Sequence, residues 1–372
     1  MQRVVILSAF LSPYRSGAEA CAEEVALRLC DRFDITIITA RLQRAGPRKL
    51  ALRGKVKMVR IGLGFGFDKW LFPFLAPLAV RSCVGAPRWG AREGIVLPQG
   101  SPAASPYEPP IIHAILETFA GLALHLCKYL IPGACRILTL QTTNRTFLKG
   151  FLIRSADHVT AISSALVSIA RDLGRNDVTL IPNGIDLSRV LTPGKDSGRI
   201  LFVGRLEKMK GVDTLLRAFA AVKGEGVHLR IVGDGSQRQA LERLTEELGI
   251  GDRVTFVGFV PVNHVYEEFA KAQIFCGLSR SEALGNVFLE AQAEGCAVIG
   301  TNVGGIPDIV QDGMTGILVP PDDVGAAARA MQKLIDDTQL RLQLAEGGRE
   351  HAKKYDWGIM SEQYLKLYNS IE

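Results

Sequence analysis

Residues 200–211 read Ile-Leu-Phe-Val-Gly-Arg-Leu-Glu-Lys-Met-Lys-Gly, and this stretch decides the fold of the second half of the chain. Its short apolar start predicts a buried strand at 200–203. A glycine turn follows, and helical spacing of apolar residues begins at 212. Strand, glycine-bearing turn and helix in this order form the unit from which parallel α/β sheets are built.

The same alternation continues to the end of the chain. Further strands are predicted at 228–232, 254–257, 274–276, 297–300 and 316–318, and helices at 212–222, 237–248, 265–270, 286–293, 304–310 and 324–336. Six strands alternating with helices make a complete doubly wound domain. One more amphipathic helix is expected at 357–371.

The first half begins with its own strand–helix–strand unit, which predicts a second parallel sheet. Its predicted elements are strands at 4–9, 35–39, 56–61, 111–112, 136–140 and 159–162, and helices at 18–29 and 118–130. The stretch 84–110 is crowded with Pro and Gly, which predicts an irregular loop. We therefore expect a first domain at 1–185, a linker at 186–197, a second domain at 198–356 and a final helix at 357–372 that crosses back to the first domain.

Composition fits an α/β protein with two cores: the chain has 372 residues, 47% hydrophobic and 22% charged. Seven scattered Cys without a C-x-x-C pair favour reduced thiols. Residues 1–10 resemble a first strand rather than a signal peptide, and the uncharged run 70–80 is shorter than the roughly 20 residues that a membrane span needs. We expect a cytoplasmic protein.

Charge is distributed unevenly along the chain. Residues 1–186 carry 23 Lys and Arg against 13 Asp and Glu, a net of +10, and the remainder carries 21 against 25, a net of −4. Eight basic residues and no acid fall within 41–60. This segment is either a solvated face or a contact with anionic lipid or a phosphate-bearing acceptor, peripheral on the inner face of a membrane. No nucleic-acid-binding motif accompanies it.

The turn after strand 200–203 places Arg205 and Lys210 before a helix. Loops at the carboxyl ends of parallel strands bind ligands, and helix N-termini attract anions. The two cations predict an anion site, although an ordinary surface loop would carry similar charges.

A second group follows strand 274–276, where two carboxylates stand eight residues apart. Gly285 and Asn286 should begin a helix whose backbone N–H groups face a diphosphate. Glu290 in the second turn of this helix could accept hydrogen bonds from ribose hydroxyls. The residues of this group are Glu282, Leu284, Gly285, Asn286, Val287 and Glu290. Other strand-end residues that could approach a ligand are Gly17, Gly233, Phe259 and Val260.

These motifs in this order closely resemble glycosyltransferase family 4. The resemblance rests on Ile181-Pro-Asn-Gly-Ile-Asp186, Val203-Gly-Arg-Leu-x-x-x-Lys-Gly211, Val232-Gly-Asp-Gly235, Ser281-Glu-Ala-Leu-Gly-Asn286 with Glu290, and Gly304-Gly-Ile-Pro307. It covers nearly the whole second domain and is thinner over the first.

The resemblance implies the GT-B fold, two Rossmann-like domains facing across a cleft, and sugar transfer with retention from a nucleoside diphosphate sugar, UDP- or GDP-linked, without a bound metal or other cofactor. Arg205 and Lys210 would take the diphosphate, Glu282 would lie near the sugar and Glu290 on the ribose. The absence of an Asp-x-Asp motif agrees with this, because fixed cations must then stabilise the leaving group. A membrane lipid or cell-envelope glycan precursor is the expected acceptor.

The chain departs from the family pattern at one strand end. His113 matches the strand-end His, but Ile115 stands where many members have a second His that projects into the cleft. Either His113 takes that catalytic role, or it is a structural His and another group does.

Two alternatives to a retaining glycosyltransferase stay open. One is a nucleotide-sugar epimerase or hydrolase on the same frame, which would release nucleoside diphosphate without an acceptor. The other is a catalytically weak donor-binding homologue, which Ile115 would explain.

Overall fold

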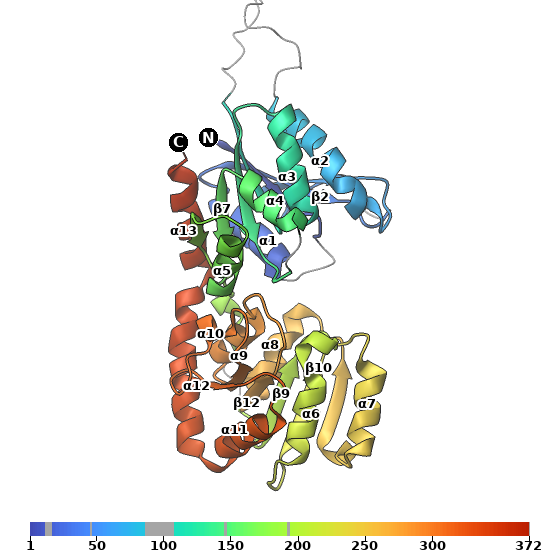
Figure 1. Ribbon diagram of the computed structural model, residues 1–372, viewed down its shortest axis with the longest axis vertical. Helices are drawn as coiled ribbons and strands as arrows, with labels where there is room; N and C mark the ends of the chain where they lie inside the picture. Colours follow the sequence, from blue (N-terminus) through green and yellow to red (C-terminus); the bar gives the residue numbers. More distant parts are fainter. Residues whose placement is uncertain (12–16, 45–46, 86–107, 145–146, 192–193, 372) are drawn as a thin grey trace, which may run out of the picture. The chain divides into compact units, whose positions relative to one another are not determined.

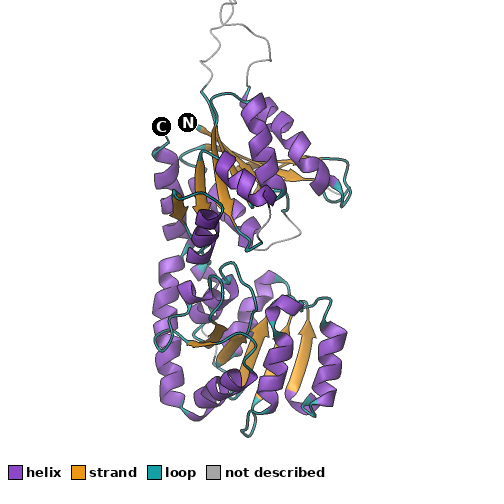
Figure 2. Cartoon of the chain, in the orientation of Figure 1, coloured by secondary structure: helices purple, strands orange, loops and turns teal. Residues whose placement is uncertain are grey.

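The computed structural model describes residues 1–11, 17–44, 47–85, 108–144, 147–191 and 194–371. These residues form two compact units: unit 1 is Met1–Ile162, Leu166–Ile181 and Ser361–Glu372, and unit 2 is Ser163–Ala165 and Pro182–Met360. Each unit contains one β-sheet, whose strands alternate with helices along the chain (Figures 1 and 2). The predicted fold class, two parallel-sheet α/β domains, is confirmed.

The sheet of unit 1 has the strand order β3-β4-β2-β1-β5-β6-β7-β8. Its strands are β1 (Arg3–Leu7), β2 (Asp34–Ala40), β3 (Lys49–Leu52), β4 (Val56–Ile61), β5 (Ile111–Ile115), β6 (Cys135–Leu140), β7 (His158–Ala161) and β8 (Val178–Leu180). The helices of this part of the chain are α1 (Gly17–Leu29), α2 (Asp68–Val84), α3 (Phe119–Leu130), α4 (Phe147–Ser155) and α5 (Ser164–Asp172).

The basic segment 41–60 contains a hairpin that the sequence analysis did not predict. β3 runs antiparallel to β4, and Arg53 and Gly54 both have positive φ, the backbone of a type I′ turn. Part of its charge is paired, because Lys57 Nζ lies 3.1 Å from an Asp34 carboxylate oxygen. The segment is therefore an edge hairpin with most of its cations exposed.

Helix α2 was also missed, because its two prolines argue against a helix from propensity alone. Pro73 and Pro77 are both buried against the rest of unit 1, as are Phe72, Ala76 and Val80. Packing of this face therefore holds the helix. The predicted loop at 84–110 falls mainly on 86–107, which lie outside the described residues.

Unit 2 has the strand order β11-β10-β9-β12-β13-β14, and all its pairs are parallel. Its strands are β9 (Arg199–Val203), β10 (His228–Val232), β11 (Val254–Gly258), β12 (Ile274–Gly277), β13 (Ala297–Thr301) and β14 (Ile317–Val319). The helices are α6 (Val212–Ala220), α7 (Arg238–Glu247), α8 (Val262–Lys271), α9 (Asn286–Ala293), α10 (Ile306–Ile309), α11 (Val324–Asp336), α12 (Thr338–Ala352) and α13 (Trp357–Asn369), the last ending in unit 1.

The strand order of unit 2 reverses direction beside β9. The chain runs from β9 through β10 to β11 on one side, and from β12 through β13 to β14 on the other. β12 pairs directly with β9, Ile274 opposite Ile200. In open parallel sheets the carboxyl ends of the strands at such a switch point form the ligand crevice.

None of the helices among the described residues has the length and apolar character to span a bilayer.

The end of α13 belongs to the core of unit 1. Tyr364 and Tyr368 are fully buried there, and the Tyr368 hydroxyl lies 2.7 Å from His113 Nδ1. His113 Nε2 lies 2.6 Å from the Thr139 hydroxyl, so both ring nitrogens have partners. Burial lowers the pKa of His113 to about 3, which keeps the ring neutral at physiological pH.

This buried His predicts an acid-sensitive core. In the unfolded chain His113 titrates near its ordinary pKa of 6.5, so below that pH the unfolded state binds one more proton and stability falls as pH falls. Between pH 7 and 5 the loss from this group should be about 2 kcal/mol, at 1.36 kcal/mol per unit. His113→Gln cannot titrate at this position, so it does not lose this stability. Urea unfolding should therefore show that the variant's unfolding free energy lies closer to that of wild type at pH 5 than at pH 7, by about 2 kcal/mol. Parallel pH profiles for the two proteins would contradict this assignment.

Candidate functional site

The loops that follow β9 and β12 meet at the switch point of unit 2. Lys210 Nζ lies 2.5 Å from a Glu282 carboxylate oxygen, with the two side chains 17% and 15% exposed. The Ser279 hydroxyl lies 3.4 Å from the same oxygen. Two residues 72 positions apart in the chain, both predicted for the donor site, therefore form one half-buried ion pair.

Arg205 lies on the same loop as Lys210, two residues beyond the end of β9, and its side chain is exposed. The loop is fixed by its backbone rather than by Arg205: the Leu206 N–H donates to Asp234 O at 2.9 Å, and Gln237 N–H donates to Leu206 O at 2.9 Å. A fixed loop that leaves a guanidinium exposed suits the binding of an anion from solution.

Gly233 fits this arrangement for a reason different from the one the sequence suggested. Its φ is +133°, and a Cβ there would come within 1.9 Å of Gly204 O. The glycine is therefore required for the two loops to lie against each other, whether or not a ligand approaches it. Ser236 also joins them, since its hydroxyl donates to Glu207 at 2.8 Å.

Helix α9 has the bounds that the sequence predicts. Gly285 is its N-cap residue, with φ +93°, and makes no side-chain hydrogen bond to the helix end. The partial positive charge at the amino end of α9 is therefore not offset by a capping side chain. Asn286 and Val287 open the helix half-buried, Glu290 follows in the second turn, and Leu284 is buried. Leu284 of the preceding loop and Phe288 of the helix are both buried and anchor this helix end in the core.

The glycine turn after β13 supports Glu282 from behind. A Cβ on Gly304 would come within 1.9 Å of Glu282 O, and the Gly305 N–H donates to that same oxygen at 3.1 Å. The motif Gly304-Gly305 thus fixes the backbone that presents the Glu282 carboxylate.

Two of the predicted residues stand at the end of β11, and one stands in the other unit. Phe259 follows β11 and is 76% exposed, with Val260 half-buried beside it. Gly17 is the first residue of α1 in unit 1, so it shares no unit with the others.

His113 lies inside the core of unit 1. It is 0% exposed, and both its nitrogens are hydrogen-bonded within the core of unit 1. Ile115 is buried in the same strand. The structural reading of His113 fits these contacts, and we propose no catalytic role for it.

Sequence reasoning missed Arg280, which ties the loops after β9 and β12 together. Its guanidinium donates to both carboxylate oxygens of Asp213 at 2.9 and 2.8 Å, to Asp322 at 2.8 Å and to Lys208 O at 2.5 Å. The backbone N–H of Arg280 donates to Met209 O at 2.7 Å. Arg280 thus holds the turn that carries Lys210 against the loop that carries Glu282.

Asp213 is the matching partner of Arg280. Burial alone would raise the pKa of Asp213, but the hydrogen bonds and charge of Arg280 outweigh it and hold that pKa below its usual range. The signal was present in the sequence: an Arg directly before Ser281-Glu282 and an Asp directly after Gly211-Val212 become neighbours once β9 and β12 are paired.

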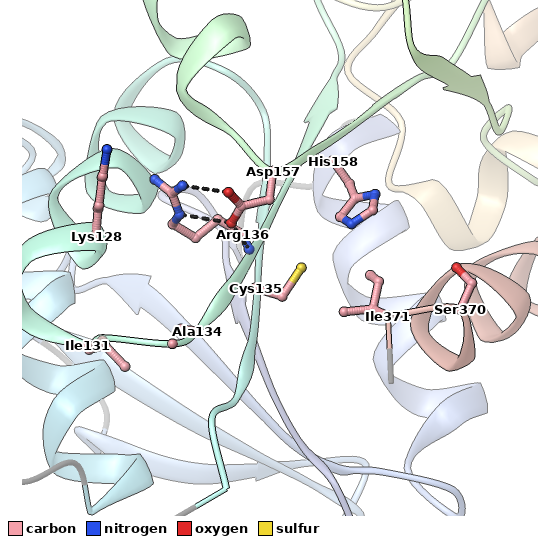
Figure 3. Close-up of a pocket in the computed structure, with 10 residues that line it drawn as sticks. Lys128, Ile131, Ala134, Cys135, Arg136, Asp157, His158, Ser370 and Ile371 are labelled. Carbon is pink, nitrogen blue, oxygen red and sulfur yellow. Dashed lines mark hydrogen bonds and ion pairs between the residues drawn. The ribbon is translucent and has the colours of Figure 1, made fainter.

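A hollow of about 540 Å³ in unit 1 lies away from any strand's carboxyl end. Figure 3 shows the Arg136 and Asp157 side chains of its lining pointing toward one another and joined by hydrogen bonds, with Cys135 and His158 nearby. Cys135 and His158 begin β6 and β7, so the hollow lies at the amino edge of the sheet. Arg136 and Asp157 pair with each other at 2.6 Å, and the hollow does not lie at the carboxyl edge where parallel sheets bind ligands, so we do not propose it as the active site.

Solved structures with the same two-unit architecture define the fold. HepE from Anabaena, solved with UDP and glucose, superposes with a TM-score of 0.77 over 100% of both chains at 19% identity. The fold is therefore GT-B, the two-domain fold of many glycosyltransferases.

Sequence comparison gives the family. Residues 186–351 match the model of glycosyl transferases group 1. The N-acetyl-alpha-D-glucosaminyl L-malate synthase of Bacillus anthracis is 31% identical over 285 residues, covering 70% of this chain and 74% of that protein. The chain belongs to the glycosyl transferases group 1.

Other relatives match over a shorter length. The D-inositol 3-phosphate glycosyltransferase of Corynebacterium urealyticum is 35% identical over 179 residues, 46% of this chain and 42% of that protein. The chain thus spans less than half the length of this relative. The matched region of the family model contains every candidate donor residue of unit 2.

Replacing Arg280 should weaken nucleotide binding without touching the nucleotide. Arg280→Ala removes the charged hydrogen bonds that hold the Lys210 turn, and we expect roughly a tenfold rise in the Kd of a bound nucleoside diphosphate, the scale of one charged hydrogen bond. Arg280→Lys should recover part of the loss. Calorimetric titration measures both, with Arg243→Ala, an exposed position on α7, as a surface control in the same unit. An unchanged Kd in Arg280→Ala would show that the clamp is not needed.

Proposed function

We propose that this chain is a retaining glycosyltransferase that moves a sugar from a nucleoside diphosphate sugar to an acceptor, with the donor held by unit 2. The observation that carries the proposal is the Lys210–Glu282 pair at the switch point of the sheet. Membership of the glycosyl transferases group 1 supports it, as does the fold shared with HepE, whose structure contains UDP.

The chemistry of the leaving group explains the choice of residues. When the bond from the sugar to the diphosphate breaks, negative charge grows on the phosphate oxygens. Arg205 and Lys210 would supply fixed positive charge there, and the amino end of α9 adds its dipole. The reaction then needs no bound metal or other cofactor for this charge.

Glu282 has a second role in this proposal. In the ion pair it orients Lys210, and the diphosphate would compete for that cation when it binds. The Glu282 carboxylate is then free to accept hydrogen bonds from sugar hydroxyls, while Glu290 on α9 accepts from the ribose. Leu284, Gly285, Asn286 and Val287 would line the phosphates with backbone. Gly233, Phe259 and Val260 would border the nucleoside.

We also propose the acceptor's class. The names of the two relatives contain different small molecules, inositol 3-phosphate and L-malate, so membership of the family does not fix the acceptor. The exposed cations of 41–60 favour an acceptor at an anionic surface, namely a membrane lipid or a cell-envelope glycan precursor, reached from the cytoplasmic face.

The donor site makes a direct prediction about nucleotides. UDP or GDP at 100 times its Kd should stabilise the fold by about 2.7 kcal/mol, seen as a rise in Tm. Arg205→Ala and Lys210→Ala should each remove most of that rise and cost about 2–4 kcal/mol of transition-state stabilisation in turnover. Arg205 is exposed, so Arg205→Ala should change the Tm without nucleotide little, whereas Lys210→Ala also removes the ion pair with Glu282 and should lower that Tm modestly. Near-normal turnover in both variants would contradict the assignment.

Turnover measured with and without an acceptor separates the transferase from the two alternative activities. Nucleoside diphosphate released at full rate without acceptor would favour a hydrolase, and nucleotide binding without turnover on any acceptor would favour a catalytically weak homologue.

Chelation tests the leaving-group chemistry. Because Arg205 and Lys210 are proposed to neutralise the diphosphate, EDTA should leave turnover largely intact. Loss of turnover that Mg²⁺ or Mn²⁺ restores would mean that a metal does this work.

A further inference from the structure

Unit 1 carries an exposed stripe of large apolar side chains on α2 and on the loop before it. Trp70, Phe74 and Leu78 are 64%, 63% and 55% exposed, and their spacing of four places them on one face of the helix. The loop adds Leu63, Phe65 and Phe67, at 57%, 37% and 49%. These six residues are the apolar stripe. Exposed apolar residues gathered in this way mark an interaction surface.

The stripe is built to point outward. The opposite face of α2 is buried in unit 1, so the helix cannot turn the stripe inward. Asp68, itself 1% exposed, accepts from the N–H groups of Gly64 and Phe65 at 2.6 and 3.2 Å and fixes the loop. The rings of Phe65 and Phe67 stack with centroids 5.3 Å apart. Figure 1 shows α2 beside α3, and Trp70 touches Phe119 of α3 edge-on and still keeps most of its surface exposed.

Cations stand at both ends of the stripe. At the loop end, the Arg44 guanidinium lies 4.4 Å from the centroid of Phe65, and Arg41 donates to Arg44 O at 2.6 Å. At the carboxyl end of α2, a hollow of about 590 Å³ is lined by Arg3, Lys49 and Lys57 together with Ala79 and Val84 of the helix. Asp34, paired with Lys57, is the one acid among the residues that line it.

We propose that the apolar stripe is a membrane-docking surface, which inserts Trp70, Phe74 and Leu78 into the interface of a bilayer that contains anionic phospholipid. Aromatic and aliphatic side chains enter the headgroup–acyl boundary, while the flanking Arg and Lys contact lipid phosphates. A second copy of the chain is a poorer occupant, because it would bring two positively charged rims together. The cations of residues 41–60 predict electrostatic contact with a membrane, and the apolar stripe adds insertion into it. Vesicle binding can be measured without a sugar donor and without turnover.

Trp70 reports on insertion directly. The chain has three Trp, of which Trp357 is 2% exposed and Trp89 lies outside the described residues. With vesicles of phosphatidylcholine and phosphatidylglycerol, emission should shift to the blue and be quenched by brominated acyl chains. Trp70→Phe keeps an apolar ring at this position, so it should still sediment with these vesicles but lose both signals. Unchanged emission of the wild type on these vesicles would overturn the proposal.

Paired variants separate insertion from attraction by charge alone. Phe74→Ser with Leu78→Ser keeps Trp70 and all cations, and should lower vesicle binding at least about tenfold in co-sedimentation. The matched control, Met314→Ser with Leu342→Ser, removes equally exposed apolar side chains from unit 2 (67% and 63%) and should bind as wild type does. Far-UV circular dichroism and Tm confirm that both fold.

Three other outcomes would contradict the proposal. Equal binding by the Phe74/Leu78 variant would leave charge alone as the cause. Equal binding to pure phosphatidylcholine would remove the role of the cations. Sedimentation equilibrium that shows a dimer broken by the Phe74/Leu78 variant, with no vesicle binding, would assign the stripe to a second copy of the chain. Because UDP binding can be measured on the same variants, failure here is distinguishable from failure of the proposed transferase activity.

Discussion

The reversal of strand order beside β9 is the constraint on which the functional architecture of unit 2 depends. Because β12 pairs with β9, the loops that follow these two strands lie together although they are far apart in the chain. The Lys210–Glu282 ion pair and the Arg280 clamp both use this adjacency. The glycine contacts behind Glu282 use the pairing of β12 with β13 on the other side. A strand inserted between β9 and β12 would separate the cations from the carboxylate.

Close backbone approach is the second condition for the site. At Gly211, Gly233 and Gly304 a Cβ would come within about 2 Å of a carbonyl oxygen of a neighbouring loop, and all three have positive φ. Gly233, which the sequence predicts as a position where a ligand approaches, is therefore also a position at which loops pack against each other. This is why Gly233 alone could not distinguish a phosphate cradle from a tight turn.

Much of unit 2 could be predicted because its buried strands are short apolar runs bounded by glycine, and helix α9 has the predicted bounds. Arg280 could not be found in the same way, since its partners Asp213 and Asp322 become neighbours only through strand pairing. In unit 1, α2 escaped prediction because Pro73 and Pro77 oppose a helix locally, while burial of both rings stabilises it. His113 was ambiguous in sequence because its partner Tyr368 is 255 residues away.

The central claim is that the loops after β9 and β12 form the donor site, and a crystal structure of the protein with bound UDP tests it most directly. The account predicts diphosphate density between residues 204–211 and the amino end of α9, with Lys210 Nζ within hydrogen-bond distance of a phosphate oxygen and its contact with Glu282 lengthened. Diphosphate density elsewhere, for example in the hollow beside Arg136 and Asp157, with the Lys210–Glu282 pair unchanged, would contradict it.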